Sequence, residues 1–128
     1  MDAMFRKYLI GAALIILSYF VIKMMKPKVQ PNYLDTPDIK ERIYADFGEK
    51  AEVAIELLRA AIKEYDYIHH PRILRCIIFL ANKNLESLVE SINMATRDPR
   101  DIMYAAEYIN STRRRDFNKT FHNCEEDI

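Results

Sequence analysis

Glycine is scarce in this 128-residue chain, which holds only Gly11 and Gly48. Loops that cradle phosphates and turns that present a catalytic nucleophile need several residues with positive φ angles, which glycine adopts most readily. The scarcity therefore counts against many classes of enzyme. It also favours helices joined by short turns over a sheet built from hairpins.

The chain also contains little cysteine and has no net charge. Cys76 and Cys124 are the only cysteines, too few for a fold held together by many disulfides. The 19 Lys and Arg residues balance 19 Asp and Glu residues, so no overall charge draws the chain to nucleic acid. Residues 1–26 are net basic and the remainder is net acidic. This distribution fits a membrane-anchored protein, and we predict no nucleic-acid partner.

Charge is missing altogether from residues 8–22, which lie between the basic residues Arg6, Lys7 and Lys23. Long basic side chains near a helix end extend their charges to the lipid headgroups, so the apolar run widens to residues 4–25. As a helix this run is about 33 Å long, enough to cross a bilayer. We predict a retained anchor with these membrane-spanning residues: Tyr8, Leu9, Ile10, Leu14, Ile15, Ile16, Leu17, Phe20, Val21 and Ile22.

Two other interpretations of residues 8–22 stay open. A cleavable signal peptide has the same basic start and apolar middle, but no A-x-A-like cleavage site follows here. A core or partner helix normally carries a polar stripe, which this run lacks. The basic flanks on the two sides nearly tie, and the unpaired cysteines favour a domain that faces the cytoplasm.

Helical periodicity dominates the chain beyond the anchor. Residues 27–37 contain prolines and no periodicity, which is typical of a short tether. Apolar residues then recur at helical spacing between Ile39 and Tyr65, which predicts one amphipathic helix of roughly 28 residues, loosened at Gly48. Residues 73–81 are apolar nearly all round and predict the most buried helix.

Capping residues mark the starts of further predicted helices. Thr36 precedes Pro37, Asn84 follows a turn, and Asp98 precedes Pro99. The last of these helices is predicted to run from Pro99 to about Asn110. The sequence thus predicts an all-α fold, with one N-terminal transmembrane helix followed by a bundle of about four helices.

The predicted domain boundaries follow from these elements. They are residues 1–26 for the anchor, 27–37 for the tether, 38–110 for the bundle and 111–128 for an irregular C-terminal tail. Phe117 and Phe121 are the tail residues expected to pack back onto the bundle.

One long segment resembles known proteins. Residues 72–108 read RILRCIIFLANKNLESLVESINMATRDPRDIMYAAEY, an Arg-bracketed apolar helix, a turn and a second helix, followed by Asp-x-Arg-Asp and Ala-Glu-Tyr. This pattern resembles small, chiefly helical bacterial proteins of unassigned function. The resemblance implies a bacterial source but no activity. Those relatives lack a membrane segment, so the anchor is an addition in this chain, for which we predict a bacterial inner membrane.

Ligand pairs at metal-site spacing are also missing. His69, His70 and Cys76 are the candidate ligands, but neither C-x₂₋₄-C nor H-x₃₋₅-H spacing occurs. A small metal-dependent enzyme or metal-binding protein that uses these three residues stays open as the alternative function. We predict no catalytic activity and no cofactor.

A candidate partner surface lies on the last predicted helix. Arg100, Tyr104 and Tyr108 follow one another at four-residue spacing and therefore share one side, with Glu107 beside them. Tyrosine and arginine dominate binding hot spots. The predicted partners are thus the lipid bilayer, through residues 4–25, and another protein, and a homo-oligomer is compatible with the sequence. The stripe predicted to face the bundle consists of Ile102, Ala105, Ala106 and Ile109.

Overall fold

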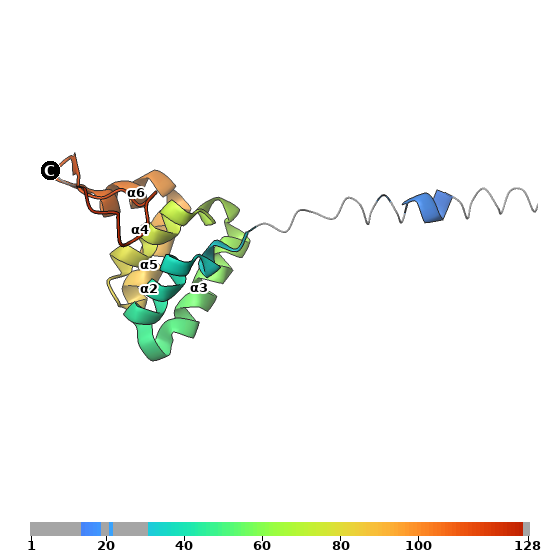
Figure 1. Ribbon diagram of the computed structural model, residues 1–128, viewed down its shortest axis with the longest axis horizontal. Coiled ribbons are helices and arrows are strands. Elements are labelled where there is room, and N and C mark those ends of the chain that lie inside the picture. Colours follow the sequence, from blue (N-terminus) through green and yellow to red (C-terminus); the bar gives the residue numbers. More distant parts are fainter. Residues whose placement is uncertain (1–13, 19–20, 22–30, 127–128) are drawn as a thin grey trace, which may run out of the picture. The chain divides into compact units, whose positions relative to one another are not determined.

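The structure of the protein, a computed structural model, describes residues 14–18, 21 and 31–126. It divides the chain into two compact units, Met1–Pro31 and Asn32–Ile128. In the first unit, residues 14–18 and 21 are helical (Figure 1), and they are exposed. None of the helices in the described ranges combines the length and the apolar character that a membrane crossing requires. Most of the predicted span, residues 4–25, lies outside the described residues. Residues 27–30 of the predicted tether also lie outside them. Residues 31–37 of the tether are described, and they include the buried Leu34.

The second unit is helical, which confirms the all-α class. Within residues 31–126, its five α-helices are α2 (Pro37–Phe47), α3 (Ala51–Glu64), α4 (Pro71–Ala81), α5 (Leu85–Arg97) and α6 (Pro99–Glu107). Three short 3₁₀ turns accompany them, η1 (Tyr33–Asp35), η2 (Gly48–Lys50) and η3 (Asp66–Ile68). Two short antiparallel strands, β1 (Tyr108–Ile109) and β2 (Thr112–Arg113), follow α6.

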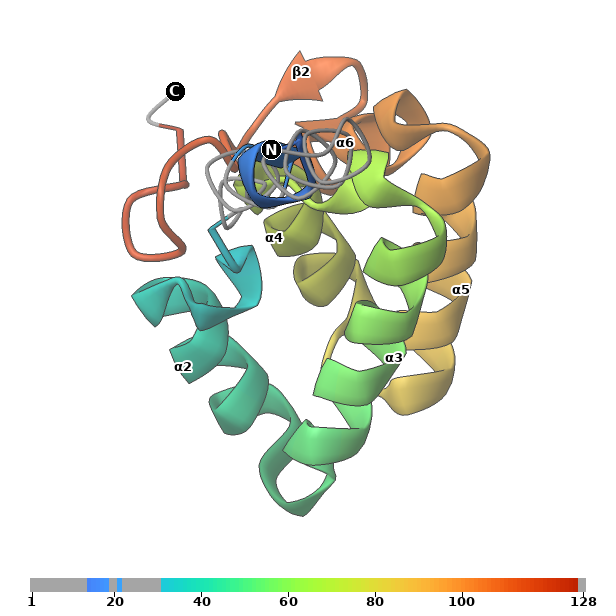
Figure 2. The ribbon, with the colours of Figure 1, turned by 90° about the vertical axis from the view of Figure 1, so that its right-hand side faces the viewer.

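Helix α4 forms the centre of this unit. It packs against α2, α5 and α6, and Figure 2 shows α5 along one side of the unit and α2 along the other. The side chain of His70 accepts a hydrogen bond from the Arg72 N–H at 3.2 Å, and Pro71 occupies the first turn. All residues from 73 to 78 are buried. The prediction of a deeply buried helix over residues 73–81 is therefore confirmed.

The prediction of a single long helix between Ile39 and Tyr65 is wrong, because the helix is interrupted at Gly48. This residue has a φ of 52° and a ψ of −119°, a backbone conformation that side-chain-bearing residues rarely adopt. Helix α2 ends there, and α3 begins after the η2 turn. Figure 2 shows that α2 and α3 diverge from this turn. The apolar stripe still faces the core on both helices, although Tyr65 at its end is exposed.

The predicted caps are partly confirmed. The side chain of Asn84 accepts from the Ser87 N–H at 3.0 Å, and that of Asp98 accepts from the Arg100 N–H at 3.0 Å. Thr36 occupies the N-cap position before Pro37, as predicted, but its side chain makes no capping hydrogen bond. Helices α5 and α6 thus start where the sequence predicts.

Helix α6 ends earlier than predicted. Tyr108 has an extended backbone, and the β1–β2 ribbon turns through Asn110 and Ser111, whose φ angles are 50° and 66°. Positive φ at both central residues is the requirement of a two-residue hairpin loop. The chain therefore leaves the helix three residues before the predicted end, Asn110.

Residues 114–126, here called the C-terminal segment, complete the core. The Phe117 side chain is fully buried, and its ring lies 5.2 Å from that of Phe79 and 5.8 Å from that of Phe121. The guanidinium of Arg42 lies over the Phe121 ring at 4.7 Å. The expected packing of the two phenylalanines is confirmed. The segment is not helical, but it belongs to the same compact unit as the helices.

We expect residues 32–128 to fold when residues 1–31 are removed. The apolar core of the second unit is built from residues between Leu34 and Cys124, so the deletion removes none of it. Circular dichroism of the shortened chain should show helical signal and one cooperative thermal transition. An insoluble product, or helical signal without a cooperative transition, would contradict this expectation.

Candidate functional site

The first polar cluster of the folded unit is a buried ion pair between α4 and α2. The Arg75 guanidinium donates to both carboxylate oxygens of Asp38, at 2.9 and 3.0 Å. It also donates to the backbone carbonyl of Phe117 at 3.1 Å, and the Phe121 N–H donates to Asp38 at 3.1 Å. Burial by itself raises the pKa of Asp38, but the bonds from Arg75 and Phe121 together hold it below its ordinary value.

A second ion pair joins α4 to α6, one helical turn away. Arg72 donates to both carboxylate oxygens of Glu107, and the Phe117 N–H donates to Glu107 at 2.8 Å. Glu107 has no exposed surface. Its predicted place on an exposed partner surface is therefore wrong.

Together the two pairs fasten the C-terminal segment to three helices. Every buried polar side-chain atom within the described part of the chain has a hydrogen-bond partner. The buried donors and acceptors of the two pairs are therefore satisfied by groups of the protein itself. We assign this cluster to the stability of the fold.

The exposed tyrosines of α6 and β1 form the second feature. Tyr104 is 55% exposed, and its ring stacks on that of the half-buried Tyr108, with centroids 5.0 Å apart and planes inclined by 18°. Arg100 is exposed on the same helix, but its guanidinium is bound to the Asp98 carboxylate at 2.9 and 3.1 Å. Three of the four predicted surface residues thus have exposed area. Among these three, Tyr104 and Tyr108 contact each other by stacking of their rings.

The inward stripe predicted for α6 is partly wrong. Ile102 and Ala106 are buried, as predicted, but Ala105 and Ile109 are exposed. The helix ends at Glu107, so Ile109 lies in the ribbon and not on the helical face. Glu107 also faces inward, where Arg72 compensates its charge.

A shallow hollow lies beside Tyr104, between α5 and α6. It is lined by Met94, Arg97, Asp101, Tyr104 and Ala105, and we call it the α5/α6 hollow. A second shallow hollow, which shares Arg97, lies along α5 next to Glu90, Asn93 and Thr96. Small-molecule sites are concave and enclose most of their ligand, so open hollows of this kind suit the surface of another protein.

Sequence reasoning missed Arg97, Asp101 and Met94 as members of this surface. Arg97 lies in the last turn of α5 and Asp101 in the first turn of α6, where these charges complement the helix dipole. Because both residues fit this common role, their charges did not single them out as members of a binding surface. They could have been predicted from the Asp98-Pro99 junction, because this junction places the end of one helix beside the start of the next.

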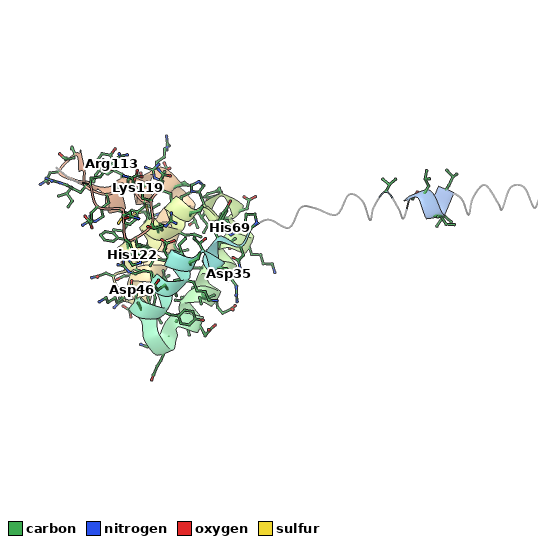
Figure 3. All side chains as sticks on the ribbon, viewed as in Figure 1. Asp35, Asp46, His69, Arg113, Lys119 and His122 are labelled. Atoms are coloured by element: carbon green, nitrogen blue, oxygen red, sulfur yellow. The ribbon has the colours of Figure 1, made fainter. Side chains whose placement is uncertain are left out.

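The candidate metal ligands have other roles. The His69 Nε2 accepts a hydrogen bond from the Tyr33 N–H at 3.1 Å, and His70 caps α4. Burial raises the pKa of the Cys76 thiol, which makes it unreactive. Figure 3 labels His69 and also His122, which lies on the C-terminal segment. No three His, Cys, Asp or Glu side chains in the described ranges are grouped so that they could hold a metal ion.

Comparison of the chain with known protein families, with curated proteins and with solved structures gives no match. The resemblance of residues 72–108 to small bacterial helical proteins therefore stays a prediction. Function has to be inferred from the surface of the folded unit and from the sequence of the N-terminal segment.

Proposed function

We propose that this protein is a single-pass membrane protein whose folded unit, residues 32–128, is an adaptor or accessory domain without catalytic activity. Residues 4–25 anchor it in a bilayer, for which we favour the bacterial inner membrane with the folded unit in the cytoplasm. The support for the anchor is the uncharged run of residues 8–22 and the basic residues on both of its sides.

The observation that carries the interaction function is the stacked pair of Tyr104 and Tyr108 beside the α5/α6 hollow. Tyrosine rings provide a large and rigid contact area with a polar tip, and they are enriched in protein interfaces. Stacking fixes the Tyr104 ring before a partner binds, which lowers the entropy lost on binding. The metal-dependent alternative has no comparable observation in its favour.

Replacement of both tyrosines, Tyr104→Ala and Tyr108→Ala, is expected to weaken partner binding at least tenfold, or roughly 1.4 kcal/mol. The measurement is affinity capture with the full-length chain from solubilised membranes, after circular dichroism has shown unchanged helicity. Tyr44→Ala removes another exposed tyrosine, on α2, and should leave capture unchanged.

The outcome that would contradict the proposal is full retention of the captured partners by the folded double variant. Tyr108 is half-buried, so its loss also tests the β1–β2 ribbon. Tyr104→Ala alone removes the more exposed ring and separates the two effects. It should weaken capture with no change in thermal unfolding.

A further inference from the structure

The α5/α6 hollow carries opposite charges that form no ion pair within residues 31–126. Arg97 and Asp101 both line it, and neither forms an ion pair with another residue in the described part of the chain. The neighbouring Arg100 is bound by Asp98. Glu90, which shares the second hollow with Arg97, also lacks an ion-pair partner among residues 31–126. The surface therefore presents one free basic group between two free acidic groups.

The centre of the same surface is apolar. The Tyr104 ring is exposed, the Met94 side chain is half-buried, and Ala105 exposes only a methyl group. Protein interfaces commonly combine an apolar centre with a charged rim. The small side chain of Ala105 permits a close approach of another backbone.

The charge pattern selects among the classes of partner. A nucleic acid or an acidic peptide requires a basic surface, and here Glu90 and Asp101 would repel it. A strongly basic partner would be attracted by Glu90 and Asp101, but it would place a like charge against Arg97. A surface of mixed sign with an apolar centre is instead complementary to a copy of itself. A twofold axis that passes between a basic and an acidic group places the basic group of each copy opposite the acidic group of the other.

We propose that the α5/α6 hollow binds a second copy of this chain about a twofold axis near Tyr104. Arg97 of each copy pairs with Asp101 of the other, so that the ion pair forms twice. This inference rests on the proposed function, because it names the partner for the same surface. Anchoring both copies in one membrane raises their effective concentration, so a modest interface suffices.

The test uses the full-length chain with two different affinity tags, co-expressed, solubilised in mild detergent and captured through one tag. Wild-type copies should capture each other. Arg97→Glu alone places two carboxylates face to face at both contacts, and Asp101→Arg alone places two guanidinium groups face to face at both. Each variant should therefore lose self-capture by at least roughly tenfold, since like charges in contact oppose binding.

The decisive arm pairs the two variants. When a chain with Arg97→Glu meets a chain with Asp101→Arg, both contacts again join opposite charges, and capture should return to near the wild-type amount. Both changed side chains are exposed, so each variant should keep its helical signal. Lys40→Glu makes a similar charge reversal on α2, on the other side of the unit from α5 (Figure 2), and should capture like the wild type.

Two outcomes would overturn the inference. One is the absence of mutual capture between wild-type copies. The other is a mixed pair that stays at background although each variant folds. If wild-type copies do not associate but a different protein is captured in a Tyr104-dependent way, the second-copy inference fails and the proposed interaction function stands. If Tyr104 and Tyr108 are dispensable for all capture, the proposed function itself fails.

Discussion

Replacing Asp38 with alanine is expected to lower the free energy of unfolding of residues 32–128 by about 3–5 kcal/mol. The change leaves the Arg75 guanidinium buried, with the backbone carbonyls of the C-terminal segment as its remaining partners. An uncompensated charge in the interior costs far more than an exposed one. Urea titration followed by circular dichroism measures the difference from the wild type.

Two controls make this expectation specific to the buried pair. Glu56→Ala breaks the exposed Arg59–Glu56 pair on α3 and should change stability little. The double variant Asp38→Ala, Arg75→Met removes both charges and should regain part of the loss, because no buried charge is left unpaired. A double variant that is less stable than Asp38→Ala would show that the ion pair is not the cause.

Acid provides a second measurement on the same residue. The pKa of Asp38 is lower in the folded protein than its ordinary value of 3.8. The ionised carboxylate therefore contributes stability above that pH and loses this contribution as the pH falls through the lower folded value. The stability gap between the wild type and Asp38→Ala should accordingly be constant near neutral pH and narrow below pH 3.8.

Phe117→Ala is expected to cost a similar amount, about 3–5 kcal/mol. The ring is fully buried and packs against those of Phe79 and Phe121, so its loss leaves a cavity between α4 and the C-terminal segment. Urea titration should show the loss. Limited proteolysis should also cut the variant earlier within residues 114–126 than the wild type.

Phe121→Ala is the matched control for this residue. Phe121 is only partly buried, so the same truncation should cost less than it does at Phe117. A change at Phe117 of less than about 1 kcal/mol would contradict the role of the C-terminal segment in the core.

Local sequence signals predicted the starts of α2, α5 and α6 and the burial of residues 73–78. Helix α4 begins at Pro71, two residues before the predicted start. Each of these signals acts over a few residues. A proline in the first turn and a capping side chain fix a helix start without any distant contact. The burial of α4 could be predicted because its residues are apolar on nearly all sides, whichever elements pack around it.

Contacts between distant residues account for most of what the sequence did not predict. Arg75 meets Asp38 across 37 residues, and Arg72 meets Glu107 across 35. A charged residue ordinarily faces solvent, so Glu107 was placed outside. No local pattern announces that Arg72 will neutralise it. At Gly48 the sequence indicated a loosened helix and not a break, because the apolar spacing continues through this residue while the backbone turns.

The α5/α6 hollow shows the same limit for the candidate site. The tyrosines were found because their spacing lies within one helix. Arg97 and Met94 belong to the preceding helix, and only the packing of α5 against α6 brings them beside Tyr104. The periodicity of one helix cannot predict a surface that two helices form together.

The hydrogen bond from Phe121 to Asp38 joins residues 83 positions apart, and this separation sets the order of events during synthesis. Chains emerge from the ribosome with the N-terminal part first. Asp38 and Arg75 are therefore made long before Phe117 and Phe121, which complete their surroundings. Until residues 114–126 are released, the helices lack part of their core. We expect the nascent chain to reach its final stability only after residues 114–126 have left the ribosome, so that chaperones and proteases meet it in an unfinished state before then.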